Sequence, residues 1–169
     1  MISADDFDTL RSIARAGRDL PVIRELINAT DWEIKHDDPR HSYLFVLVPD
    51  EIDKSYELII GRLHPLREPH PFLRFRAFPP SEEYLEAFNA TFHSAAEVIA
   101  QCVGTPTTGG ERKLFFRKWS FAYYRWSLPE GEFTLVQDET SIKHDIEVTL
   151  WIQRVGTPLR ETLNYHMTD

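Results

Sequence analysis

Two histidines and two aspartates fall within the six residues from His36 to His41. Imidazole and carboxylate groups gathered in this way are ligands that a zinc ion can use. No second histidine pair or multi-cysteine motif accompanies them, because Cys102 is the only cysteine of the chain. Asp-Asp-Pro is also ordinary turn chemistry. We therefore interpret this segment as a turn and predict no metal site.

Other residues that could act in acid–base or nucleophilic chemistry lack recognisable partners. His64 and His70 each precede a proline in a loop-like segment, with no carboxylate or nucleophile identifiable beside them. His93 and Glu97 lie one helical turn apart, which is typical of a surface pair. Cys102 falls on the apolar stripe of a helix, where a thiol is usually inert. We predict no catalytic residues, no cofactor and a non-enzymatic function.

The acidic residues form the clearest functional pattern in a chain whose net charge is −8. Segment 111–128 is mainly basic and segment 130–147 mainly acidic, so pairing across neighbouring antiparallel strands accounts for Arg125 and Glu132. Asp138 and its neighbours are expected beside a loop, where no strand neutralises them. Together with acidic turns of the first half they predict a negative, partner-binding edge, made of Asp37, Asp38, Asp138, Glu139, His144 and Asp145.

This charge balance suits a cationic protein partner and disfavours direct binding of DNA or RNA, which requires a basic surface. The alternative is that the charge serves only solubility. The longest apolar run, 43–48, is too short to span a bilayer, and the N-terminus lacks a signal core. With a single cysteine, these features predict a cytoplasmic protein that does not enter a membrane.

Hydrophobic periodicity predicts helices in both halves of the chain. Ser3 caps a first helix that ends at Gly17, and Asp19 with Pro21 begins a second that ends near Thr30. A longer helix, capped by Ser81, ends at the Gly-Thr-Pro sequence 104–106. Its apolar stripe steps by three or four residues through Leu85, Phe88, Phe92, Ala95, Ile99 and Cys102.

Alternating or continuous apolar runs predict strands after each helical segment. These runs cover residues 32–36, 43–48, 57–64, 72–78, 113–119, 121–128, 132–138 and 146–155. Residues 107–110 are predicted to form a loop. The 169 residues thus predict a single α+β domain with N-terminal helices, an antiparallel meander, a long amphipathic helix and a second antiparallel meander. A two-half organisation, 1–78 and 81–156, fits this order, and one sheet or two would satisfy it.

Aromatic residues are dense in the second meander, at Trp119, Tyr123, Tyr124 and Trp126. Alternation along a strand places some of them in the core and others outside, where they would anchor an interface. Both roles stay open.

The second half has a recognisable layout. A helix ends in Val103-Gly104-Thr105-Pro106 and is followed by strands carrying Tyr124-Arg125-Trp126, Glu132-Phe133-Thr134-Leu135-Val136 and Glu147-Val148-Thr149-Leu150-Trp151-Ile152. Over residues 81–156 this layout resembles small acidic immunity proteins of bacterial contact-dependent and polymorphic toxin systems. The resemblance implies an inhibitor, monomeric or homodimeric, that neutralises a cognate toxin such as a cationic nuclease or another secreted effector. A dimeric secretion chaperone or adaptor and an enzyme of unidentified chemistry are the alternatives.

Overall fold

One antiparallel sheet of eight strands forms the centre of the molecule. The computed structural model describes residues 2–17, 19–38, 43–48, 55–61, 70–76, 85–113, 120–139 and 146–163. The first four strands are β1 (Glu33–Asp38), β2 (Tyr43–Val48), β3 (Ser55–Gly61) and β4 (His70–Arg76). The other four are β5 (Thr108–Lys113), β6 (Ser120–Leu128), β7 (Gly131–Glu139) and β8 (Ile146–Gln153).

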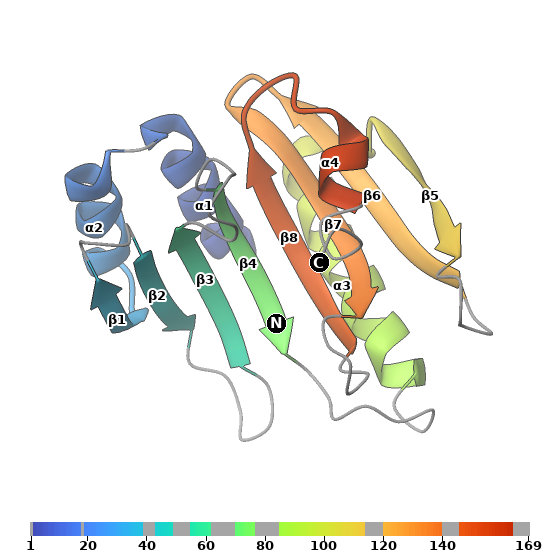
Figure 1. Ribbon diagram of the computed structural model, residues 1–169, viewed down its shortest axis with the longest axis horizontal. Helices are drawn as coiled ribbons and strands as arrows, with labels where there is room; N and C mark the ends of the chain where they lie inside the picture. The colour runs from blue at the N-terminus through green and yellow to red at the C-terminus, as the bar shows by residue number, and fades with distance from the viewer. Residues whose placement is uncertain are drawn as a thin grey trace.

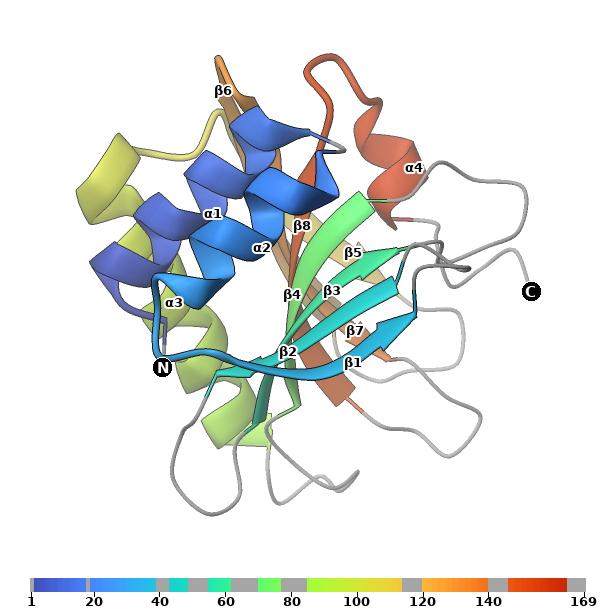
Figure 2. The same ribbon diagram turned by 90° about the vertical axis from the view of Figure 1, so that its left-hand side faces the viewer.

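The strand order is β1-β2-β3-β4-β8-β7-β6-β5. Because β4 pairs with β8 from Phe72↔Trp151 to Phe75↔Val148, the two meanders share one sheet. Helices α1 (Ala4–Ala16), α2 (Leu20–Asn28) and α3 (Leu85–Val103) cover one face, whereas the short α4 (Leu159–Leu163) lies on the other face (Figures 1 and 2). The predicted α+β class, with its order of helices and meanders, is confirmed.

The N-terminal helices begin where their capping residues predict. The Ser3 hydroxyl accepts the amide hydrogen of Asp6, and the Asp6 carboxylate accepts the amide hydrogen of Ser3, forming a capping box. Asp19 caps α2 in the same manner, by accepting from the Val22 amide. Gly17 ends α1 with a φ of 63°, a conformation that favours glycine.

The apolar stripe of α3 packs against the sheet, as predicted, and builds most of the core there. Phe88, Phe92, Ala95 and Ile99 are buried, and Cys102 is half-buried at the end of the stripe. The predicted cap, Ser81, lies outside the described residues. Phe133 of β7 meets Phe7 of α1 edge to face, with ring centroids 5.4 Å apart, and so joins α1 to the same core.

Strand β5 contradicts the predicted loop at 107–110, because Thr108, Gly109 and Gly110 pair with β6. The two glycines do not form a turn, and tyrosine rings of β6 lie directly beside them. A Cβ on Gly109 would lie 2.4 Å from Cδ1 of Tyr124, and one on Gly110 would lie 3.0 Å from the Tyr123 hydroxyl oxygen. A glycine pair inside a strand therefore reflects close approach of side chains.

The aromatic cluster divides between the core and the surface. Trp126 is buried, and its Nε1 donates to the carbonyl oxygen of Gly104 at 2.9 Å, just after α3. Tyr124 stacks on Phe92 of α3 with ring centroids 5.3 Å apart. Tyr123 is half-exposed, and Trp119 lies outside the described residues. Among the helices that the structure describes, none is long and apolar enough to cross a membrane.

Candidate functional site

Asp138 does not lie at an open loop, so the prediction that no strand neutralises it is wrong. It belongs to β7, faces away from the helices and is 3% exposed. The guanidinium group of Arg112, on β5, donates to its carboxylate and forms an ion pair with it. Arg112 and Asp138 are separated by 26 residues in sequence, and β6 brings them together by pairing with both strands.

The other predicted site residues do not form one edge. Asp37 and Asp38 were expected in a turn, but they pair with Leu44 and Tyr43 as the last residues of β1. Glu139 is the last residue of β7, which runs in the opposite direction to β1 in this antiparallel order. Asp38 and Glu139 therefore end strands at opposite ends of the sheet. His144 and Asp145 lie outside the described residues.

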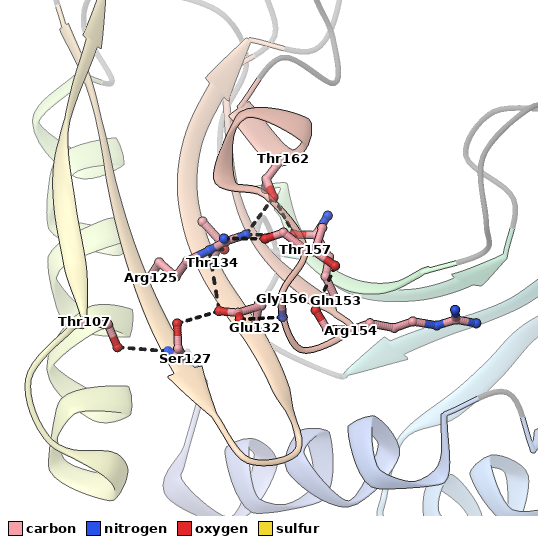
Figure 3. A network of polar contacts seen from close by, with 10 residues as sticks. All are labelled: Thr107, Arg125, Ser127, Glu132, Thr134, Gln153, Arg154, Gly156, Thr157 and Thr162. Carbon is pink, nitrogen blue, oxygen red and sulfur yellow. Dashed lines mark hydrogen bonds and ion pairs between the residues drawn. The ribbon is translucent and has the colours of Figure 1, made fainter.

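A buried polar network occupies the sheet face opposite the long helices (Figure 3). At its centre is Arg125, which is 5% exposed. Its Nε donates to Thr134 Oγ1 at 2.8 Å, and its terminal nitrogens donate to the Thr157 carbonyl at 2.7 Å and to Gln153 Oε1 at 3.3 Å. Loss of hydration on burial lowers the pKa of Arg125, and the nearby Glu132 carboxylate raises it in part.

Glu132 supplies the negative charge of this network. Its Oε2 lies 4.0 Å from Arg125 Nε, and it is 6% exposed. The carboxylate also accepts from the Ser127 hydroxyl at 2.6 Å and from the Gly156 amide at 2.9 Å. The predicted cross-strand pairing of Arg125 with Glu132 is confirmed as an ion pair. Because the Arg125 guanidinium and the Glu132 carboxylate both have partners within this network, the network fixes the structure of the sheet.

A third buried carboxylate, that of Glu130 in the turn between β6 and β7, contacts α1. Arg11 Nε donates to it, Arg15 lies 3.5 Å away, and the Glu130 side chain is 4% exposed. Burial alone would raise the pKa of Glu130, but the hydrogen bond from Arg11 and the charges of Arg11 and Arg15 outweigh it, so the pKa is lowered from its ordinary value of 4.5.

The lowered pKa of Glu130 predicts a loss of stability in acid. Because this carboxyl binds its proton at lower pH in the folded chain than in the unfolded chain, it stabilises the fold above pH 4.5, and that contribution disappears as pH falls through the folded pKa. Between about pH 6 and about pH 3, the free energy of unfolding measured in urea should fall less steeply for Glu130→Gln than for the wild type. Arg11→Met should reduce the decline in the same way, and an unchanged slope in both variants would contradict this origin.

Exposed carboxylates gather on the described part of the helical layer. Carboxylates outnumber guanidinium groups in this layer, because α3 contains no lysine or arginine. Two of the arginines, Arg11 and Arg15, are directed to the Glu130 carboxylate. Asp6 and Asp19 serve mainly as caps. The acidic residues of the described helical layer are Asp5, Asp6, Asp8, Asp19, Glu25, Asp31, Glu86 and Glu97, against Arg11, Arg15 and Arg24.

The thiol of Cys102, near the end of α3, is influenced by charged residues of α1. Burial raises the pKa of Cys102, and the carboxylates of Asp8 and Asp5 on α1 raise it further, while Arg11 lowers it in part. A thiol whose pKa is raised stays protonated at neutral pH and is a poor nucleophile. The surroundings of Cys102 therefore favour an inert thiol at the end of α3.

Within the described part of the chain, no three His, Cys, Asp or Glu side chains are close enough together to hold a metal ion. Residues 39–41 of the His36–His41 segment lie outside the described residues. No protein-family model, curated protein or solved structure matches this chain.

Proposed function

We propose that this chain is a non-enzymatic inhibitor of the immunity type, which binds a cationic bacterial toxin through its helical layer. The observation that supports this most is the charge of α3. Glu86 and Glu97 are exposed, lie three turns apart on one side of the helix, about 16 Å along its axis, and have no lysine or arginine between them.

The neighbouring helix α1 extends this acidic surface. It packs against α3 and adds the exposed carboxylates of Asp5 and Asp8. Asp8 also forms an ion pair with Arg11 at 3.4 Å. Complementary charge steers two proteins together and speeds their association, and it rejects partners of like charge. A basic protein surface, such as the cleft of a nuclease, is therefore the partner that this layer fits. The proposed binding surface is therefore the helical layer and not the sheet edge predicted from the sequence.

Neutralisation of a toxin in the cell tests this proposal directly. The product of the neighbouring gene is expressed with and without this chain, and growth of the host is measured. We expect growth arrest by that product alone, rescue by this chain, and recovery of the two proteins as a complex that dissociates with rising salt. Growth arrest without rescue, or rescue without a complex, would contradict an inhibitor that acts by binding.

A further inference from the structure

The chain crosses the second face of the sheet after β8, and residues 157–163 form a segment that we call the strap. Polar contacts anchor both of its ends, and Figure 3 shows those of Arg125 with Thr157 and Thr162. At the start, Arg125 donates to the Thr157 carbonyl at 2.7 Å. At the end, Arg112 donates to the Leu163 carbonyl, where the negative end of α4 favours a cation. Two arginines on neighbouring strands thus hold the strap at its two ends.

Most side chains of the strap are exposed or half-buried. Thr162 is its only buried residue, whereas Pro158, Arg160 and Glu161 are exposed. The Thr162 hydroxyl donates to Gln153 and lies 3.2 Å from a terminal nitrogen of Arg125. Leu159 and Leu163 are half-buried, and no apolar side chain of the strap is fully buried. Because burial of apolar surface is the main force that holds an element in place, the strap is held largely by hydrogen bonds that water can replace.

Opening of the strap would leave no buried charge without a partner. Arg125 keeps the carboxylate of Glu132, and Arg112 keeps that of Asp138, because both carboxylates come from β7 and not from the strap. The large penalty for an uncompensated buried charge is therefore absent. The turn before the strap also stays anchored, since the Gly156 amide donates to Glu132 at 2.9 Å.

We infer that the strap opens from the sheet as a unit while the eight-stranded sheet stays folded, with its hinge at the turn that contains Gly156. Gly156 has a φ of 83°, and Arg154 and Val155 before it are exposed, so rotation about the Gly156 backbone can move the strap while the Gly156 amide stays bonded to Glu132. In the open form, the guanidinium donors that held Thr157 and Leu163 meet solvent. The strap is thus a removable cover over two guanidinium groups.

Native-state hydrogen exchange of the full chain, followed residue by residue at increasing denaturant, tests this inference. We expect the amides of Glu161, Thr162 and Leu163 to exchange at least about 100-fold faster than those of Leu135 and Leu150, with one shared opening free energy and little dependence on denaturant. Exchange of the strap only together with β7 and β8 would overturn the inference. A steady gradient from Glu161 to Leu163 would also overturn it, because that pattern indicates fraying.

A pair of matched variants adds a second readout. Thr162→Val removes the hydroxyl and nearly preserves the side-chain shape, and should speed exchange of the strap amides by about tenfold with little change in β7 and β8. Thr91→Val is the control, because the Thr91 hydroxyl donates to the Ala87 carbonyl within α3. Equal acceleration of the strap and of both strands by Thr162→Val would show that the strap is an integral part of the core.

Discussion

Replacement of Phe133 with alanine should lower the free energy of unfolding by about 4 kcal/mol, which is the range for a fully buried aromatic residue. Phe133 is completely buried on β7, and its ring meets that of Phe7 at an interplanar angle of 63°. The substitution therefore removes one of the contacts that join α1 to the sheet and leaves a cavity behind. Urea or guanidinium unfolding measures the effect.

Graded substitutions keep this prediction testable if the alanine variant does not fold. Phe133→Leu retains much of the volume and should cost roughly 1–2 kcal/mol. Phe7→Leu should cost a similar amount. The double variant should cost less than the sum, because both changes remove the same ring contact. A loss below about 1 kcal/mol for Phe133→Ala would contradict the position of α1 on this core.

Glu132→Gln should destabilise the fold by about 3 kcal/mol, although it changes only one charge. The glutamine retains the size of the side chain, so packing is little altered. Arg125, however, is 5% exposed and would lose the carboxylate that offsets its charge. Chemical denaturation at neutral pH measures the loss. The exposed Glu161→Gln is the matched control and should change stability by less than about 0.5 kcal/mol.

A double-mutant cycle separates the charge effect from lost hydrogen bonds. Arg125→Met removes the cation together with its bonds to Thr134 and Thr157, so this single variant should also be destabilised. Once the cation is absent, adding Glu132→Gln should cost at least about 1 kcal/mol less than it does in the wild type. Costs that add within about 0.5 kcal/mol would contradict the coupling of these two charges.

Local signals were sufficient for the helices, because the groups that form their caps lie within three residues of each other. Ser3 and Asp6 specify the start of α1, and Asp19 with Pro21 specifies that of α2. The stripe of α3 was likewise readable from its spacing, since one face of a helix is fixed by sequence period alone. The order of helices and strands followed from these elements.

Non-local contacts explain what the sequence did not predict. Gly109 and Gly110 are typical of a loop until Tyr124 and Tyr123 are known to lie over them. Asp138 falls near the end of its strand, and only the strand order shows that Arg112 reaches it. The excess of basic residues in 111–128 was a usable signal for that partner, since opposite charges on neighbouring strands commonly pair.

The helical layer is the surface that we propose binds a cationic protein. Glu97 lies on this layer, and Glu161 lies on α4 at the opposite face, so charge reversal at each position compares the two faces with the same change of charge (Figure 2). The association rate with the neighbouring gene product, measured at low and high salt, is the most direct test. We predict that Glu97→Lys slows association by about tenfold at low salt, less at high salt, and that Glu161→Lys has little effect. Equal slowing by both variants, or slowing by Glu161→Lys alone, would contradict the claim.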